Sequence, residues 1–157
     1  MTKKVLVLSA SFRKHGNSDM LCDRFIQGAR EAGNEVEKIY VSDMRIGYCR
    51  GCGVCNRTHK CVQNDDMAAV LDKMVAADVY FYSMNGQLKT LIDRTVPRYE
   101  EIRGKDFYYI VAAADDNRDN MRRIIEGFRA FADDCLEGSR EKGIVYGVGA
   151  WQAGDIK

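Results

Sequence analysis

The chain has 157 residues, a length that suits one domain with a substantial core. Its 24 basic and 23 acidic side chains nearly cancel, so the overall charge gives no reason to expect binding to nucleic acid or to a membrane surface. No apolar run approaches the length of a membrane span, and the first residues lack a signal-peptide cleavage pattern. We therefore expect a cytoplasmic protein.

Taken in chain order, apolar residues recur with two kinds of spacing, one typical of strands and one typical of helices. Strands are predicted at about residues 4–8, 35–41, 79–82, 107–113 and 143–148. Helices are predicted at about residues 18–32, 65–77, 86–96 and 117–136. Because strands and helices alternate, the sheet should be parallel and covered by helices on both faces. Five such strands in one domain spanning residues 1–157 indicate an α/β fold of the flavodoxin-like, doubly wound type.

The loop between the first strand and the first helix is small, polar and basic. It offers the side chains of Ser11, Arg13, Asn17 and Ser18, and the helix that follows offers unpaired backbone N–H groups. In an open parallel sheet this loop lies at the carboxyl end of its strand, where ligands bind. We interpret it as a phosphate site, because hydroxyl, amide and guanidinium groups beside a helix N-terminus suit an anion. The alternative is an ordinary connecting loop whose Asn or Ser caps the helix.

The six cysteines divide into a cluster and two isolated residues. Cys22 and Cys135 lie within helical patterns and are predicted to be small core residues. The clustered cysteines are Cys49, Cys52, Cys55 and Cys61. In a reducing compartment such a cluster indicates metal binding or redox chemistry rather than a disulfide framework.

The spacing within this cluster leaves three interpretations open. Cys-x2-Cys-x2-Cys-x5-Cys is close to the compact spacing of four-iron clusters, and Gly51 and Gly53 would let the backbone wrap around one. Zinc could use the same thiolates, although zinc sites more often use two separated pairs. The third interpretation is a set of free thiols that Arg50, Arg57 and Lys60 make more reactive.

Four segments, taken together, carry a family resemblance. Residues 9–18 (SASFRKHGNS) are similar to a phosphate loop of the form S-x-S-P-R-x-x-G-N-S/T, with Phe12 where proline is usual. Residues 49–67 are similar to a cysteine loop with the helix start that follows it, residues 79–85 to an isoalloxazine loop, and residues 87–95 to the helix after that loop. The chain thus resembles the flavodoxin-like NAD(P)H-dependent FMN reductase family, including its iron-sulfur flavoprotein branch.

The resemblance implies a set of cofactor-binding residues. Those expected to hold the FMN phosphate are Ser11, Arg13, Asn17 and Ser18. Those expected to border the flavin ring are Tyr80, Phe81, Tyr82, Ser83, Met84 and Asn85, with Ala114 and Asp115 in the next loop at the same end of the sheet. In the iron-sulfur branch a 4Fe-4S cluster would be held by Cys49, Cys52, Cys55 and Cys61. Because a flavin carries out the redox chemistry itself, no catalytic acid or base is expected. Without the resemblance, the three aromatic residues would be interpreted as part of a buried strand.

Two functions follow from the resemblance. One is an enzyme that passes reducing equivalents from NAD(P)H through bound FMN to a quinone, a free flavin or another small-molecule or protein acceptor. The other is an electron carrier that relays electrons between FMN and an iron-sulfur cluster. A third interpretation is a non-enzymatic, metal-binding interaction module on the same scaffold. The resemblance also implies a homodimer or homotetramer.

The chain departs from the family just before the aromatic loop. Relatives have a buried apolar strand there, whereas here Ala77 and Asp78 lead directly into Val79 and Tyr80. Either residues 79–82 also serve as the central strand, or the residues of that strand are absent from this chain. Loss of the central strand would leave the first strand without a neighbour on one side.

Overall fold

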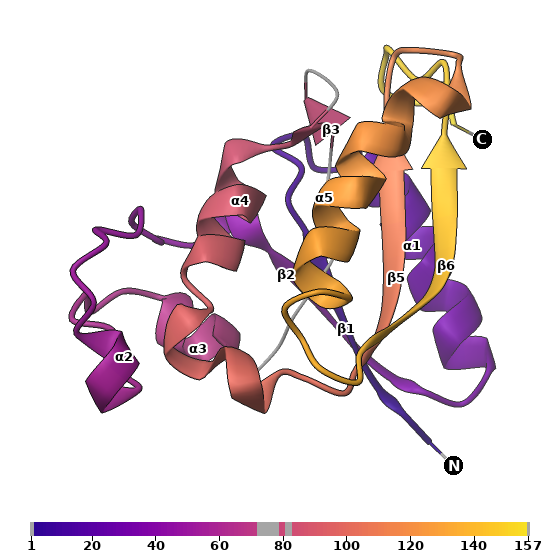
Figure 1. The fold of residues 1–157 in the computed structure, drawn as a ribbon. Helices are drawn as coiled ribbons and strands as arrows, with labels where there is room; N and C mark the ends of the chain where they lie inside the picture. The colour runs from indigo at the N-terminus through magenta and orange to yellow at the C-terminus, as the bar shows by residue number, and fades with distance from the viewer. Residues whose placement is uncertain (1, 72–78, 81–82, 157) are drawn as a thin grey trace.

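The computed structural model describes residues 2–71, 79–80 and 83–156, whose arrangement is shown in Figure 1. The strands are β1 (Lys4–Ser9), β2 (Glu35–Tyr40), β3 (Val79–Tyr80), β4 (Ser83–Met84), β5 (Asp106–Ala112) and β6 (Arg140–Gly147). The α-helices are α1 (Asn17–Glu31), α2 (Cys55–Thr58), α3 (Met67–Leu71), α4 (Gly86–Asp93) and α5 (Arg122–Ala132). The 3-10 helices are η1 (Val41–Asp43), η2 (Val96–Glu101) and η3 (Arg118–Met121). Within the described ranges, no helix is both long enough and apolar enough to cross a membrane.

The long strands form two parallel pairs. β1 pairs with β2 in unbroken register, and β5 pairs with β6 with one irregularity near the start of the pair. α1 contacts strands of both pairs. Just before β1, Lys3 Nζ lies 2.9 Å from Oδ2 of Asp106, the first residue of β5. The two pairs therefore run side by side in one layer, with β1 and β5 starting at the same edge (Figure 1).

Side chains alternate between the two faces of this layer, as strand geometry requires. On one face, Val7 of β1 and Ile110 of β5 pack with Cys22 and Ile26 of α1. The larger cluster lies on the other face, where α3, α4 and α5 cover the strands. Its buried members include Leu8, Met67, Leu88, Val111 and Ile124. Helices thus cover both faces, as the alternation of elements predicts.

The single five-stranded parallel sheet is not confirmed. In the described ranges the parallel strands form two separate pairs, β1–β2 and β5–β6. The interpretation of residues 79–82 as the central strand is corrected, because Val79 and Tyr80 pair antiparallel with Met84 and Ser83. The physical reason is proximity along the chain: a partner three to five residues away costs little loop-closure entropy, and a two-residue strand is too short to bridge β1 and β5.

Two predicted helices are described over shorter ranges. α5 ends at Ala132, so the helical periodicity that placed Cys135 in the core no longer applies there. Cys135 is exposed, which corrects the prediction, whereas Cys22 is buried as predicted. Of the helix predicted over residues 65–77, the structure describes α3, and residues 72–77 lie outside the described ranges.

Tyr109 of β5 offers a test of the core. It is buried, its ring stacks on Phe128 with ring centres 4.9 Å apart, and its hydroxyl has no hydrogen-bond partner in the described part of the chain. Burial raises the pKa of Tyr109 above its usual range, so the hydroxyl stays neutral.

An unpaired buried hydroxyl costs about 1–3 kcal/mol, so we expect Tyr109→Phe to raise the free energy of unfolding by about 1 kcal/mol. Urea denaturation of both proteins measures the difference. Tyr108→Phe, at an exposed neighbouring position, is the control and should change stability little. A clear loss of stability in Tyr109→Phe would contradict the assignment of an unpaired hydroxyl.

Candidate functional site

The loop between β1 and α1 is folded tightly on itself. The Ser11 hydroxyl donates to the carbonyl of Arg13 at 3.1 Å and accepts from the N–H of Arg13 at 3.2 Å. The N–H of Gly16 donates to the same carbonyl at 2.9 Å. A Cβ atom on Gly16 would lie 2.9 Å from that carbonyl oxygen, so a larger residue would clash with the turn. Ser11 is buried by this arrangement, whereas Arg13 is exposed.

The N-terminus of α1 begins where this loop ends. Gly16 occupies the N-cap position, and no side chain caps the helix. A helix of 15 residues with an uncapped N-terminus presents N–H donors and a partial positive charge to an anion. Ser18 is half-buried in the first turn, and Arg13 is exposed in the preceding loop. These groups have the chemistry that a phosphate group requires.

Asn17, in contrast, turns toward the segment that follows β6. Its side chain is buried, and its Nδ2 donates to the carbonyl of Gln152 at 2.7 Å. Its Oδ1 accepts from the N–H groups of Gly154 at 3.1 Å and Ile156 at 3.4 Å. The side chain of Asn17 therefore ties residues 152–156 to the start of α1.

Asp19, a residue that the sequence analysis did not identify, fixes the loop between β1 and α1 through its buried carboxylate. Its side chain is fully buried and accepts hydrogen bonds from the Ser9 hydroxyl (3.1 Å), the His15 N–H (2.8 Å) and the Tyr40 hydroxyl (3.1 Å). Lys38 Nζ of β2 lies 2.6 Å from its Oδ1. Burial alone would raise the pKa of Asp19, but the bonds from Lys38 and from the His15 N–H outweigh burial and hold the pKa below its usual range.

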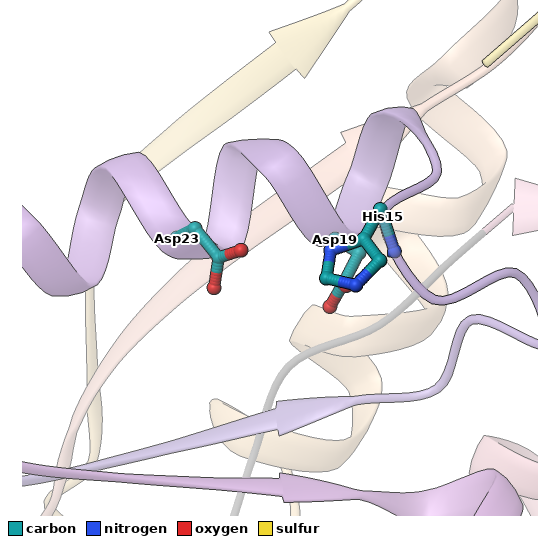
Figure 2. A group of neighbouring side chains, drawn as sticks. All are labelled: His15, Asp19 and Asp23. Carbon is teal, nitrogen blue, oxygen red and sulfur yellow. The ribbon is translucent and has the colours of Figure 1, made fainter. Parts of the chain in front are cut away.

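His15, Asp19 and Asp23 lie together along the start of α1 (Figure 2). Their potential ligand atoms lie within 4.8 Å of one another, a spacing that a metal ion could use. The ammonium group of Lys38, however, lies 2.6 Å from an oxygen of Asp19 and 2.6 Å from an oxygen of Asp23. Lys38 thus occupies the place between the two carboxylates and offsets part of their negative charge. The cluster is explained as a structural ion-pair network.

The predicted flavin loop is described only in part. Phe81 and Tyr82 lie outside the described residues, and for Tyr80 the structure describes a backbone that pairs with Ser83. Ser83 is exposed, and Met84 is half-buried against α5. Their contact with a flavin ring therefore stays a proposal.

Asn85 connects this loop to the one after β1. Its buried side chain accepts from the N–H of Leu88 at 2.9 Å, which caps the N-terminus of α4. Its Nδ2 donates to the carbonyl of Ala10 at 2.7 Å. Because Ala10 directly precedes Ser11, Asn85 fixes the start of α4 against the candidate phosphate loop.

The loop after β5 lies at the same end of the layer as the candidate phosphate loop, because β1 and β5 are parallel and start together. Ala114 is exposed there. The carboxylate of Asp115 accepts from the N–H of Asn117 and from Nδ2 of Asn120, each at 2.8 Å. The backbone carbonyl of Asp115 accepts from the N–H of Gly149 at 2.9 Å. Asp115 therefore stabilises the conformation of its own loop.

The four clustered cysteines line one hollow of about 250 Å³. The first two are exposed, Cys55 and Cys61 are half-buried, and all four are free thiols. Gly51 and Gly53 have φ of +61° and +67°, in the left-handed region that favours glycine. Nothing lies within 4 Å of the place that a Cβ on Gly51 would occupy, so the backbone conformation, not lack of space, calls for glycine there. The backbone thus curves around the hollow as the glycines predict.

The thiols are spread more widely than a single ion would hold them. In the described part of the chain, no three cysteine sulfurs lie within 4.8 Å of one another. Tetrahedral zinc, with Zn–S bonds of about 2.3 Å, would hold its sulfurs about 3.8 Å apart. A four-iron cluster binds one thiolate at each iron and therefore separates the thiolates further. Thiolates are the donors of both kinds of centre, so the assignment of a 4Fe-4S cluster stays a proposal.

A buried ion pair closes the base of the cysteine segment. Arg94, at the C-cap of α4, has a side chain that is 1% exposed. Its two terminal nitrogens donate to the two carboxylate oxygens of Asp65 at 2.7 and 2.8 Å, and one of them also donates to the carbonyl of Gly47 at 2.6 Å. The hydrogen bond from Arg94 holds the pKa of Asp65 below its usual range, and the same bond raises the pKa of Arg94, with a smaller contribution from Cys61.

Sequence reasoning missed Asp19, Lys38 and Arg94, which hold the two candidate sites in place. A buried charge gives no periodic signal, and its partner is distant along the chain: Asp19 pairs with a residue of β2, and Arg94 pairs with a residue 29 positions earlier. The one available hint was an acidic residue in the first turn of α1.

Comparisons with known proteins agree with this geometry. Residues 3–121 match the model of a family described as NADPH-dependent FMN reductase. An iron-sulfur flavoprotein of Archaeoglobus fulgidus is 37% identical over 102 residues, which cover 60% of this chain and 46% of the relative. An iron-sulfur flavoprotein of Methanosarcina thermophila is 34% identical over 100 residues, which cover 59% of this chain and 52% of the relative. The chain thus spans about half the length of these curated relatives.

Solved structures resemble the fold. The Trp repressor binding protein of Bacillus subtilis aligns with a TM-score of 0.64 and 23% sequence identity, covering 97% of this chain and 88% of that one. This likeness supports the flavodoxin-like α/β fold predicted from the order of elements.

The network around Asp19 makes a prediction about stability and pH. Asp19→Asn would leave Lys38 paired only with the exposed Asp23, so we expect it to lower the free energy of unfolding by about 3 kcal/mol near neutral pH. Because folding lowers the pKa of Asp19, its contribution is present above the unfolded pKa of about 3.9 and is lost as the pH falls through the folded pKa.

The stability difference between wild type and Asp19→Asn should therefore stay constant from about pH 5 to 9 and shrink below about pH 4. Chemical denaturation at several pH values measures it. Asp43→Asn, which removes an exposed carboxylate paired with Lys14, is the control and should have a small effect. A difference that persists undiminished at pH 2.5 would contradict the assigned role of the ionised carboxylate.

Proposed function

This chain belongs to the NADPH-dependent FMN reductase family, and on that premise we propose that it is an FMN-dependent oxidoreductase that takes reducing equivalents from NAD(P)H and passes them to a quinone, a flavin or another acceptor. The observation that carries the proposal is the uncapped N-terminus of α1 beside a turn built from Ser11, Arg13 and Gly16. A helix end of this kind suits the phosphate of a mononucleotide.

The residues of the chain would bind and orient the cofactor. The N–H groups at the start of α1, with the hydroxyl of Ser18 and the guanidinium of Arg13, would hold the phosphate. Asn85 would fix the flavin-side loop through its bond to Ala10, and Ser83 would lie at the exposed edge of that loop. Bound FMN would accept a hydride from the nicotinamide and pass electrons on, so the protein needs no general base for this step.

A second role is favoured by the hollow that the four cysteines line. Four thiols around a glycine-bent backbone suit a 4Fe-4S cluster held by Cys49, Cys52, Cys55 and Cys61. Such a cluster would exchange single electrons, and the chain would then serve as an electron carrier between the cluster and FMN. The names of the two curated relatives agree with this role.

We also propose assembly as a homodimer or homotetramer. Exposed apolar side chains lie near the cysteines along the chain and in η2, namely Tyr48, Val62, Val96 and Tyr99. Val62 and Val96 line the same hollow as the cysteines. Apolar groups grouped in this way suit an interface between subunits.

The phosphate site is tested by a charge placed within it. Ser18→Asp would set a carboxylate in the first turn of α1, where it would repel the phosphate, so we expect FMN to bind at least about tenfold more weakly. Ser18→Ala removes one hydroxyl without adding charge and should weaken binding much less. Quenching of flavin fluorescence during titration of the apoprotein measures both. Equal affinity in wild type and Ser18→Asp would exclude this helix end as the phosphate site.

The cysteine site is tested by an absorption spectrum of protein purified without oxygen, with iron and sulfide assays on the same sample. We expect flavin bands, a broad shoulder and about four iron atoms per chain. Cys52→Ser should lose iron while FMN stays bound, whereas Cys135→Ser, at an exposed cysteine far along the chain, should keep both. Flavin without iron in the wild type would leave the reductase role and exclude the electron-carrier role.

A further inference from the structure

Hydrogen bonds join the two ends of the segment that carries the four cysteines. We use "cysteine loop" for residues 48–63 and "neck" for Gly47, Asp65 and Arg94. Gly47 is held on both sides: its N–H donates to Asp65 Oδ2 at 3.0 Å, and its carbonyl accepts from Arg94 at 2.6 Å. Asp65 in turn takes both terminal nitrogens of Arg94. Arg94 therefore bonds both ends of the cysteine loop at once.

Elsewhere the cysteine loop has few contacts: α2 touches η2, and at the base the N–H of Arg45 donates to the Asp66 carboxylate while the Arg45 carbonyl accepts from the Asp66 N–H. The one helix of the loop, α2, has four residues and no buried side chain. The stretch from Cys49 to Gly53 is exposed. Gln63 adds a bond from its Nε2 to the carbonyl of Tyr48 at 3.0 Å, and this bond also lies next to the neck. The conformation of the loop thus depends on contacts at its base and with η2, and not on a core of its own.

One hydrogen-bond donor of the Arg94 side chain is unpaired among the described residues. Its Nε is buried, and among the described residues nothing accepts a hydrogen bond from it. Cys61 lies near enough to influence the guanidinium group. A buried donor without a partner is costly in a folded protein, so this one calls for an explanation. The unused donor is on the side chain that closes the cysteine loop.

The helix that carries Arg94 is anchored at its other end as well. Asn85 caps the N-terminus of α4 and bonds the carbonyl of Ala10 beside the candidate phosphate loop. Eight residues at about 1.5 Å each make α4 about 12 Å long. One short, rigid helix therefore connects the loop proposed for FMN to the loop proposed for the cluster.

We propose that Arg94 is the positioning residue of the cysteine centre: it closes the cysteine loop before metal binds, and its positive charge stabilises the negative charge of the thiolate-bound centre. The charge role rests on the proposed function, whereas closure of the loop does not. Arg94 acts through Gly47 and Asp65 and does not itself ligate the metal.

Closure is tested on the metal-free protein by hydrogen–deuterium exchange read by mass spectrometry. In Arg94→Gln, amides of residues 48–63 should exchange at least about tenfold faster than in wild type, while peptides from β5 and α5 stay unchanged. Arg94→Lys keeps the charge but not the fork of donors, and its exchange should be intermediate. Arg103→Gln removes an exposed arginine that pairs with Glu137 and is the matched control. Unchanged exchange in Arg94→Gln would overturn the closure role.

Co²⁺ serves as a second probe of the same metal-free proteins. Thiolate-to-cobalt absorption should appear in wild type, and its half-saturation should need about tenfold more Co²⁺ in Arg94→Gln. If Arg94→Gln does not fold, Asp65→Asn tests the same neck, because it keeps the size of the side chain and weakens the two-point bond to Arg94. Wild-type affinity for Co²⁺ in the folded variant would also overturn closure.

The charge role is tested on the iron-loaded protein by redox titration. Reduction adds negative charge to the cluster, so Arg94→Gln should shift the potential to more negative values and Asp65→Asn to more positive values. A merely structural role would not give shifts of opposite sign, and shifts in the same direction would overturn the charge role. If the wild type contains no iron, the electron-carrier function is overturned. If its residues 48–63 still exchange more slowly and it still binds Co²⁺ more tightly than Arg94→Gln, closure by Arg94 is supported.

Discussion

The ion pair between Arg94 and Asp65 is the constraint on which the cysteine loop depends. Burying a guanidinium group costs several kcal/mol unless its geometry is nearly ideal, and here two parallel hydrogen bonds of 2.7 and 2.8 Å meet that condition. The pair would be a poor choice for stability alone, because apolar side chains of the same volume often serve equally well. What apolar side chains could not do is bond the carbonyl of Gly47, and so join two segments that lack a core of their own.

Polar anchors of this kind recur wherever the functional loops meet the layer of strands. Asn85 bonds Ala10, Asn17 bonds residues 152–156, and Asp19 bonds Ser9 and His15. Each anchor is buried, and each bonds at least one backbone group in a loop. Loops carry many backbone polar groups, which must find partners when they are buried. The anchors supply those partners from the side of the core, and Arg13, Cys49 and Cys52 stay exposed for ligands.

The sequence predicts local structure well here and distant pairing poorly. β1, α1 and β5 lie close to their predicted positions because their apolar periodicity is strong. Gly51 and Gly53 adopt the left-handed conformation that their place between cysteines indicates. The prediction that Cys135 lies in the core was wrong, because a pattern of apolar residues does not show where a helix ends. The central strand was unresolved by sequence because residues 79–82 suit both a strand and a loop, and the structure pairs Val79 locally with Met84.

The anchor beneath the candidate phosphate loop also raises an electrostatic question. Asp19 lies in the first turn of α1, so its negative charge, left alone, would repel an anion at the same helix end. Lys38, 2.6 Å away, offsets that charge. The pKa of Lys38 is itself raised: burial would lower it, but hydrogen bonds to Asp19 and Asp23 outweigh burial. The ammonium group therefore stays charged throughout the neutral range. Asp19 can then hold the loop through Ser9, His15 and Tyr40 with little repulsion of a bound phosphate. Because Lys38 is paired with it, Asp19 can fix the shape of the site without making the site strongly negative.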